Sequence, residues 1–394
     1  MNLPENAALS FEKYYGKSAE GVVFCPYRIC PVGAHIDHQH GKVTGFAINY
    51  GICAAYSVNE SGFSLSSEQF PLSVSFPLDK IAEHKQNDWA DYLRGAVIEL
   101  RRMREISRGV NVRFCASLPP IGGLSSSAAV VISFLKALCL ANSVSLSDSE
   151  LITAAKMAEN NYVGVNSGIL DQSCEVLSEK GKLLLLDTVN GAHRLVPPGG
   201  SFKMKLLILS SGVQRTLASS RYNLRVDECK AVAYALSAYK NAENSCKFAD
   251  TYLRDAEPET FAEYGSRLPE TWRRRAEHFF TESARVDEAV TAWTRGDAVH
   301  FGRTVTASGD SSINNYEAGS AELIKLHEII KSTDGVLGTR FSGAGFGGCS
   351  LAFVECEFTE FVKRKIKEKY LGEYPALSGS FAAYEAETAD GVHI

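Results

Sequence analysis

The feature that most constrains the fold is a glycine- and serine-rich stretch at residues 119–130, with the sequence PPIGGLSSSAAV. We call this stretch the serine loop. Between residues 112 and 118, apolar and polar residues alternate, which is the period of a β-strand. Residues 128–140 are apolar almost all round, which predicts a buried helix of about three turns. The serine loop is therefore predicted to join a strand to the start of a helix.

A loop in this position can bind an anion. The first N–H groups of a helix lack partners within it, and the helix dipole adds partial positive charge, so the site favours a phosphate. Gly122 and Gly123 would let the backbone approach that anion closely. Ser125, Ser126 and Ser127 add hydroxyls that can cap the helix or reach a metal ion. On these residues alone, a capped helix after a tight turn is the simpler interpretation.

Composition limits the class of protein. The 394 residues, 45% of them hydrophobic, suffice for a large core in one or two domains. A net charge of −5 gives no basic surface for nucleic acid, and the arginines at 273–275 fit a solvated helix face. Ten cysteines without a C-x-x-C pair favour reduced thiols. Without a transmembrane-length apolar run or a signal-peptide core, we expect a cytoplasmic protein that does not use a membrane.

A second polar stretch lies at residues 26–52, between two strand-like segments. Arg28, His35 and Asp37 lie in a part of it that is too irregular for a helix. Polar residues clustered between strands indicate a site rather than a simple connection. The run HIDHQH could in principle bind zinc, but its spacing matches no common zinc pattern.

The middle of the chain adds two acidic candidates. Ser147 and Glu150 have the spacing of a capping box, and the helix that they begin carries Glu159 near its end. Residues 169–177 predict another helix with Asp171 in its first turn. A carboxylate at that position could simply complement the helix dipole, which is the better interpretation of an isolated aspartate.

A glycine-rich stretch at residues 339–349 contains the spacing of a dinucleotide-binding fingerprint, Gly343-x-Gly345-x-x-Gly348. That fingerprint should open a helix, whereas residues 350–354 have the character of a strand. We therefore interpret residues 339–349, which we call the glycine turn, as a connection between two strands. It is either a simple hairpin or a backbone surface that packs against the serine loop.

Three segments together resemble the galactokinase family of the GHMP kinases. Residues 28–41 are similar to the signature G-R-x-N-x-I-G-E-H-T-D-Y-x-x-G, the serine loop is similar to P-x-G-x-G-L-S-S-S-A, and the glycine turn is the third. The family also has counterparts of three further segments, SGILDQ at 167–172, SSRYNLR at 219–225 and ADG at 389–391. The resemblance therefore covers nearly the whole chain. It implies an α+β fold with two domains and the active site in the cleft between them. We place these domains at residues 1–195 and 196–394.

The resemblance also implies transfer of the ATP γ-phosphate to the anomeric hydroxyl of a sugar, with Mg²⁺. No G-x-x-x-x-G-K-[ST] is present, so the serine loop would bind the nucleotide. Asp171 matches the base that accepts the hydroxyl proton. Arg28 would lie beside it, keep it ionised and stabilise the phosphoryl oxygens. Because a neighbouring arginine also makes Asp171 a weak base, orientation of the hydroxyl is an alternative role for Asp171. Ser127 and Glu159 match ligands of Mg²⁺. The other matches are Gly122, Gly123, Leu124, Ser125, Ser126 and Ala128 for ATP, and Ala34, His35, Asp37, His38 and Tyr222 for the sugar.

Departures from the family pattern bear on nucleotide binding and on the substrate. Ile121 replaces the first glycine of the serine-loop pattern, and Cys30 replaces the signature asparagine. Ala34 replaces the signature glutamate. The resemblance implies that a glutamate at this position is a partner for the sugar 6-hydroxyl in galactokinases. A carboxylate there would repel a uronic acid, whose C6 is itself a carboxylate. The segment also resembles the motif of plant galacturonokinases, so we expect a galacturonate 1-kinase.

Two alternatives stay open at the level of the sequence. The first is an ordinary galactokinase or another neutral-sugar 1-kinase. The second is a non-catalytic sugar sensor of the same fold, although the serine motif and the residues matched to catalysis are intact. For the group that would hold a substrate carboxylate, His38 and Arg221 are candidates. The oligomeric state is not predicted.

Overall fold

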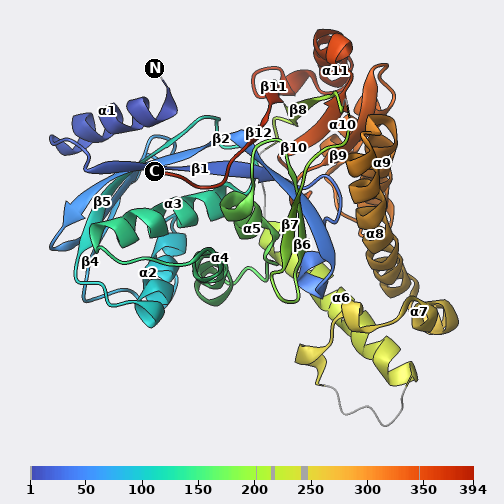
Figure 1. The fold of residues 1–394 in the computed structure, drawn as a ribbon, viewed down its shortest axis with the longest axis horizontal. Coiled ribbons are helices and arrows are strands. Elements are labelled where there is room, and N and C mark those ends of the chain that lie inside the picture. Colours follow the sequence, from blue (N-terminus) through green and yellow to red (C-terminus); the bar gives the residue numbers. More distant parts are fainter. Residues whose placement is uncertain (1, 201, 214–217, 241–246, 346) are drawn as a thin grey trace.

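The computed structural model describes all residues except 1, 201, 214–217, 241–246 and 346, and of residues 218–221 it describes the backbone alone. It contains two β-sheets, each covered by helices (Figure 1). The elements of the first group are α1 (Leu3–Tyr15), β1 (Gly21–Ile29), β2 (Lys42–Asn59), β3 (Gly62–Ser67), β4 (Val74–Pro77), α2 (Asp91–Met103), β5 (Gly109–Ala116), α3 (Ser126–Ala141), α4 (Asp148–Met157), α5 (Leu170–Leu177), β6 (Leu183–Asp187) and β7 (His193–Val196). The elements of the second group are β8 (Lys205–Ser210), α6 (Ala218–Lys240), α7 (Pro258–Tyr264), α8 (Glu270–Arg295), α9 (Ala298–Asn314), α10 (Ala321–Lys331), β9 (Val336–Phe341), β10 (Cys349–Val354), α11 (Thr359–Glu373) and β11 (Ala382–Ala386). The last strand, β12 (Thr388–Ala389), belongs to the first sheet.

The first sheet has the order β4-β3-β5-β2-β6-β7, and β1 and β12 also pair with β2. Both of its faces are covered, with α1 on one side and α2, α3 and α4 on the other (Figure 1). The alternation of β2 matches this arrangement, because Ala54 joins the main core while Cys53 and Ala55 pack against α1. The predicted strand, loop and helix around the serine loop are confirmed as β5 and α3.

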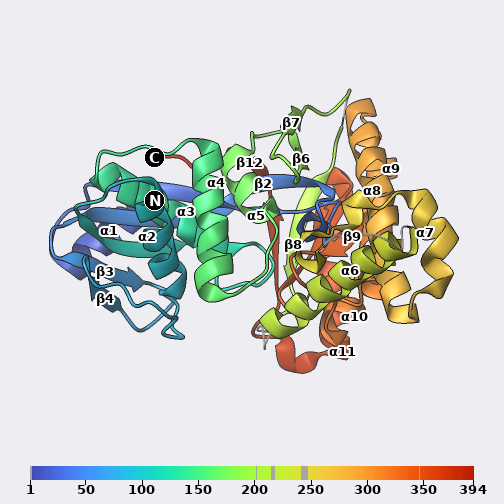
Figure 2. The same ribbon diagram turned by 90° about the horizontal axis from the view of Figure 1, so that it is seen from below.

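The second sheet is antiparallel, with the order β11-β8-β10-β9. The two groups of elements lie side by side, and β2 extends from the first toward the second (Figure 2). The last residues return to the first sheet, where Thr388 pairs with Ile48 and His393 bridges to Phe24. The expected α+β fold with two domains is confirmed. The boundary at residues 195 and 196 falls inside β7 and stays a prediction.

Helix α8 carries the arginines at residues 273–275 and stops where Gly296 adopts a left-handed φ of 75°. The prediction that the arginines at 273–275 lie on a solvated helix face is wrong for Arg275, because its side chain is fully buried. It is buried because two carboxylates, those of Glu228 and Glu317, neutralise its charge at 2.6 and 2.5 Å.

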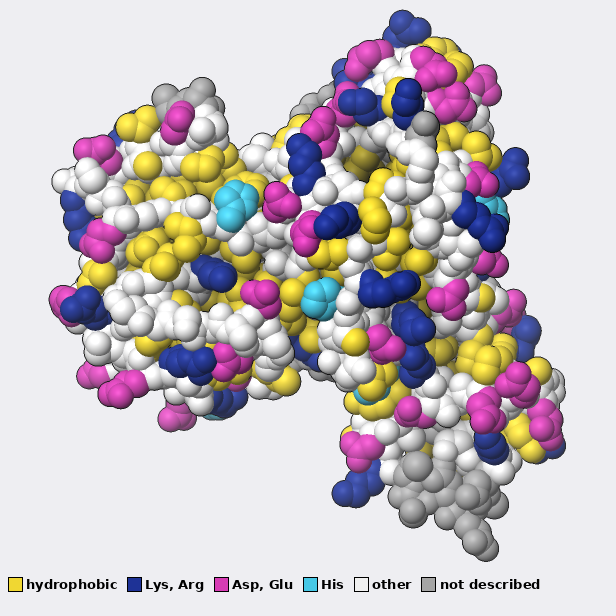
Figure 3. Space-filling view, in the orientation of Figure 1, with side chains coloured by type: hydrophobic (Ala, Val, Ile, Leu, Met, Phe, Trp, Pro, Cys, Tyr) yellow, Lys and Arg dark blue, Asp and Glu magenta, His cyan; other side chains and the backbone are white. Residues whose placement is uncertain are grey.

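Charged side chains of both signs are interspersed on the face shown in Figure 3. Among the helices of the described residues, none combines the length and the apolar character that are needed to cross a bilayer.

Candidate active site

The serine loop ends in a strained residue. Ser125 precedes the first residue of α3 with φ 62° and ψ 34°, in the left-handed region. That conformation costs a residue with a side chain roughly 1–2 kcal/mol. Its hydroxyl makes no capping bond to the helix, contrary to the simpler interpretation of the sequence. It donates instead to Oδ2 of Asp171 at 2.5 Å, because an ionised carboxylate is a stronger acceptor.

The glycine turn packs directly against the serine loop. Ser342 Oγ donates to the carbonyl oxygen of Gly123 at 2.7 Å. Gly123 has φ +97°, and a Cβ added there would lie 2.5 Å from the Ser342 carbonyl oxygen. A Cβ on Gly343 would lie 2.7 Å from Gly123 Cα. Because β9 and β10 pair antiparallel on either side of this turn, both the hairpin connection and its packing on the serine loop are confirmed.

Arg28 and Asp171 form an ion pair at the base of the serine loop. Arg28 lies within β1 rather than in the irregular segment where the sequence placed it. Its Nη2 lies 2.7 Å from Asp171 Oδ1, and its Nη1 donates to the Gly123 carbonyl oxygen at 2.9 Å. Burial lowers the pKa of Arg28, but the Asp171 charge and its hydrogen bond raise it above the usual value. The Asp171 side chain is 32% exposed and can therefore meet a substrate.

A cavity with many polar lining residues, which we call the polar cavity, opens beside this ion pair. Both groups of elements line it, since Tyr222 comes from α6 and Gly343 from the glycine turn, while the ion pair belongs to the first group. Of the predicted site residues, those that line it are Arg28, Ala34, His35, Asp37, Ser125, Ser126, Ser127, Glu159, Asp171 and Tyr222. Those that do not line it are His38, Gly122, Gly123, Leu124 and Ala128.

His35 lines this cavity and has one unpartnered ring nitrogen. The residue is 7% exposed, its φ is 64°, and its ring stacks on Tyr316 with centroids 4.4 Å apart. Its Nε2 is buried and has no hydrogen-bond partner among the described residues. Burial lowers the pKa of His35 well below its usual value, and the charge of Arg340 adds to the shift. The imidazole is therefore neutral and has one polar group available for a ligand.

Two other polar residues of the signature segment form hydrogen bonds with other residues of the chain. His38 shares a hydrogen bond of 3.0 Å with the Tyr316 hydroxyl and another of 3.2 Å with Gln39, so it lies behind the cavity wall. Asp37 accepts from the Leu170 backbone at 3.4 Å, and burial followed by the Asp171 charge raises its pKa. The side chain of Arg221, the second candidate for holding a carboxylate, lies outside the described residues.

Glu159 and Ser127 provide further oxygen atoms at this cavity. Glu159 lies in a π-helical turn at Ala158–Val163, is 5% exposed, and accepts from Gln172 at 2.9 Å. Burial and the Asp171 charge raise its pKa to about 7, while a hydrogen bond from Ser127 lowers it. Within the described residues, no three His, Cys, Asp or Glu side chains converge on one point. The two oxygen donors fit Mg²⁺, which takes few protein ligands and completes its shell with phosphate and water.

A second cavity also borders the serine loop and has a mostly apolar lining. It contains Phe70 and Trp89, whose rings stack at 5.9 Å, as well as Ile121, and it meets the polar cavity at Ser126 and Ser127. An apolar slot beside a phosphate-binding loop suits a nucleobase. The sequence analysis missed these aromatic residues, because an isolated tryptophan before a helix carries no spacing signal.

Glu175 is a further residue that the sequence analysis missed. It lies one helical turn after Asp171 in α5 and is 0% exposed. Neither of its carboxylate oxygens has a hydrogen-bond partner among the described residues. Burial raises its pKa well above the usual value, and the Asp171 charge adds to the shift. A neutral carboxyl group therefore lies beneath the ion pair.

Comparisons with known proteins show the family of this chain. Residues 9–58 match the galactokinase galactose-binding signature, and residues 91–179 match the GHMP kinases N terminal domain. The chain is 36% identical to a galacturonokinase of Arabidopsis thaliana, over 91% of this chain and 89% of the relative. It is 33% identical to a galactokinase of Clostridium perfringens, over 90% of this chain and 91% of the relative.

Solved structures agree with these relatives. Lactococcus lactis galactokinase complexed with galactose superposes with a TM-score of 0.89 and 28% identity, over the whole of both chains. The mevalonate kinase of Methanococcus jannaschii shares the fold, with a TM-score of 0.64 at 16% identity. The fold and the serine loop thus define a GHMP kinase. Within that class, the chain belongs to the galactokinase family and is a sugar 1-kinase.

Proposed function

We propose that this enzyme transfers the γ-phosphate of ATP to the anomeric hydroxyl of galacturonate, with Mg²⁺. The observation that carries the choice of sugar is Ala34, which lines the polar cavity where the signature has a glutamate. An alanine leaves the C6 carboxylate of a uronate unopposed, whereas a glutamate would repel it. The Arabidopsis thaliana galacturonokinase among the relatives supports the same substrate.

The surroundings of Ala34 also favour a negative charge. The neighbouring His35 offers an imidazole nitrogen that lacks a partner among the described residues. The charges of Arg340 and Arg28 both lower the pKa of His35, so both cations lie near its ring. Arg340 is 1% exposed, and its ion-pair partner Glu282 lies at 3.8 Å. A neutral His35 can donate one hydrogen bond to a carboxylate.

The chemistry is assigned to the residues around the ion pair. Asp171 would accept or orient the anomeric hydroxyl, and Arg28 would stabilise charge on the phosphoryl oxygens. The serine loop would hold the nucleotide phosphates, with the base in the apolar cavity. Ser127 and Glu159 would hold Mg²⁺, which supplies charge neutralisation between the phosphates. We also propose a cytoplasmic location, supported by the nine cysteines of the described residues, which form no disulfide.

Galactose is the second candidate substrate. The galactokinases among the relatives and the Lactococcus lactis galactokinase complexed with galactose favour it. A non-catalytic sensor is disfavoured, because Arg28, Asp171 and the serine loop form a complete site.

A panel of sugars tests this proposal. The purified enzyme is given ATP and Mg²⁺ with galacturonate, galactose, glucuronate, N-acetylgalactosamine or arabinose, and ADP release is measured. We expect the highest kcat/KM with galacturonate. A higher kcat/KM with galactose would replace the substrate and leave the kinase assignment, whereas no turnover of any sugar would contradict the catalytic function.

A further inference from the structure

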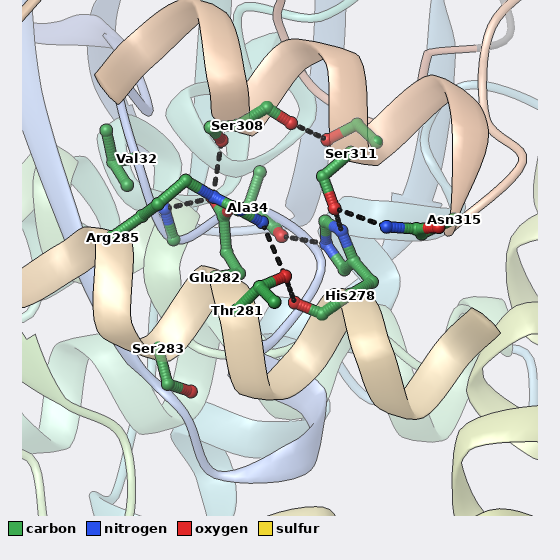
Figure 4. Close-up of polar contacts among 12 residues, drawn as sticks. Val32, Ala34, His278, Thr281, Glu282, Ser283, Arg285, Ser308, Ser311 and Asn315 are labelled. Atoms are coloured by element: carbon green, nitrogen blue, oxygen red, sulfur yellow. Dashed lines mark hydrogen bonds and ion pairs between the residues drawn. The ribbon is translucent and has the colours of Figure 1, made fainter. Parts of the chain in front are cut away.

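Side chains of helix α8 bind the backbone of residues 33 and 34, and Figure 4 shows His278 and Glu282 beside Ala34. The carboxylate of Glu282 accepts from the Gly33 backbone N–H at 2.7 Å. His278 Nε2 lies 3.0 Å from the Ala34 carbonyl oxygen. The two side chains are four residues apart, so they project from one face of α8. One helix thereby binds the N–H of Gly33 and the carbonyl oxygen of Ala34.

These bonds stabilise an unfavourable backbone conformation. Gly33 has φ +98° and His35 has φ 64°, so left-handed residues lie on both sides of Ala34. The left-handed region disfavours a residue with a side chain, and His35 needs external contacts to stay in it. In this conformation His35 lines the polar cavity. Tyr316 adds a stacking contact on the ring, but it does not bind the backbone of these residues.

A chain of hydrogen bonds leads from Asn315 through Ser311 and His278 to Ala34. A carbonyl oxygen only accepts, so Nε2 of His278 donates to it. Burial lowers the pKa of His278 to about 4, so the ring is neutral and its Nδ1 accepts from Ser311 Oγ at 2.9 Å. Asn315 Nδ2 in turn donates to Ser311 Oγ at 3.2 Å. Figure 4 shows this chain running from α9 through α8 to Ala34.

Glu282 is held in its ionised form. It is 0% exposed, and besides Gly33 it accepts from Arg285 Nε at 2.7 Å and from Ser308 Oγ. Burial raises the pKa of Glu282, but His278, Arg285 and Arg340 outweigh that effect, and the pKa is lowered overall. The bond to Gly33 is therefore charge-assisted and strong.

We propose that His278 and Glu282 are positioning residues for the sugar site. They hold residues 33–35 so that His35 faces the sugar, and they set sugar affinity without touching the ligand. The proposal rests on the proposed function in one respect, namely that His35 contacts the sugar. A merely structural role would instead lower stability and affect the two substrates alike.

The test compares KM values for the two substrates. His278→Leu removes the donor to Ala34 and should raise the sugar KM about tenfold, the equivalent of a lost hydrogen bond of roughly 1.4 kcal/mol. The KM for ATP should change by less than about twofold. His278→Gln, whose amide can donate to the same carbonyl oxygen, should restore most of the sugar affinity. Ser283→Ala is the matched control, because Ser283 lies on α8 and its hydroxyl donates to the Phe279 carbonyl oxygen at 2.8 Å.

Other outcomes are equally informative. If His278→Leu does not fold, His278→Asn replaces it, because the shorter amide can reach Ser311 but not Ala34. An unchanged sugar KM in a folded variant, or equal changes in both KM values, overturns the positioning role. The measurement uses whichever sugar the wild-type enzyme prefers, so a preference for galactose contradicts the proposed substrate but not the positioning role. A wild-type enzyme that neither binds nor phosphorylates any sugar overturns both.

Discussion

Arg28 and Asp171 are 143 residues apart in the chain, yet Nη2 of Arg28 lies 2.7 Å from Oδ1 of Asp171. Ser125 donates to the other carboxylate oxygen at 2.5 Å, so the serine loop, β1 and α5 meet at one side chain. Asp171 is the most exposed part of this cluster and lines the polar cavity. A sugar hydroxyl placed there would meet a carboxylate whose orientation is already fixed.

Asp171→Asn should therefore remove turnover and keep binding. The amide has nearly the same shape but cannot accept a proton, so kcat should fall about 10²–10⁴-fold. Sugar affinity should change by less than about threefold, because the variant still fills the same space. Steady-state kinetics and calorimetric titration with the sugar measure the two quantities. Near-normal turnover would exclude Asp171 as the base, and parallel losses of binding and rate would favour the orienting role.

Gly123→Ala should weaken ATP binding through a local clash. The added Cβ would lie 2.5 Å from the Ser342 carbonyl oxygen, and the φ of +97° is unfavourable for alanine. Overpacking of this kind typically costs about 1–3 kcal/mol, which corresponds to a rise in the KM for ATP of roughly 5- to 150-fold. Gly181→Ala is the control, because Gly181 has φ +78° with open space around it. Equal effects of the two substitutions would mean that strain alone, and not the packing of the two loops, is responsible.

Glu159→Gln should raise the Mg²⁺ requirement. Removal of a ligand oxygen charge should increase the Mg²⁺ concentration for half-maximal rate by at least about tenfold. In the wild-type enzyme the pKa of Glu159 is about 7, so below pH 7 the metal must displace a proton. The apparent Mg²⁺ affinity should then rise with pH up to about 7 and level off above it, and the variant should lose this dependence. Mg²⁺ titrations of the rate at several pH values check both effects, and an unchanged Mg²⁺ requirement counts against Glu159 as a ligand.

Glu175→Gln should stabilise the protein at neutral and alkaline pH. Burial raises the pKa of Glu175 in the folded state above the ordinary value of 4.5, so between these two values the native state binds more protons than the unfolded state. The free energy of unfolding therefore falls as pH rises through this range, by about 1.4 kcal/mol per pH unit. Urea unfolding at pH 4 and pH 8 measures the effect, which should be absent at pH 4. Glu179→Gln, at an exposed position just after the end of α5, is the control. Equal stability of wild type and Glu175→Gln at pH 8 would show that Glu175 has a partner there.

The serine loop could be predicted because its signal is local. Two glycines and three serines between an alternating segment and an apolar one define a loop before a helix, and this is what the structure contains. Asp171 is different, because its surroundings alone indicated only a dipole-complementing aspartate. The resemblance to a family singled it out, and the structure then placed Arg28 beside it.

Contacts between distant elements could not be predicted. Nothing local in α8 indicates that His278 and Glu282 bind the backbone of residues 33–35, which lie about 250 residues earlier in the chain. Arg275 looked like part of a solvated run, because its two carboxylate partners come from other elements. His38 is of a residue type that often binds ligands, but its ring is hydrogen-bonded to the Tyr316 hydroxyl. Burial and pairing of this kind depend on the tertiary structure.

The choice between two sugars can be tested at Ala34. This residue is 6% exposed and lines the cavity, so a longer side chain would project toward the bound sugar. Ala34→Glu should depress activity on galacturonate by charge repulsion and raise activity on galactose by adding an acceptor for its 6-hydroxyl. A charge-assisted hydrogen bond of roughly 1.5–3 kcal/mol corresponds to about one to two orders of magnitude in affinity.

The matched control separates charge from size. Ala34→Gln introduces a side chain of the same length without the negative charge, so it should obstruct galacturonate less than Ala34→Glu does if repulsion is the cause. The ratio of kcat/KM for galacturonate to that for galactose should therefore fall in the order wild type, Ala34→Gln, Ala34→Glu. Equal losses in both variants would mean that Ala34 matters through space alone. If the wild-type enzyme prefers galactose and Ala34→Glu leaves the ratio unmoved, water fills the place of the missing glutamate and the uronate assignment is wrong.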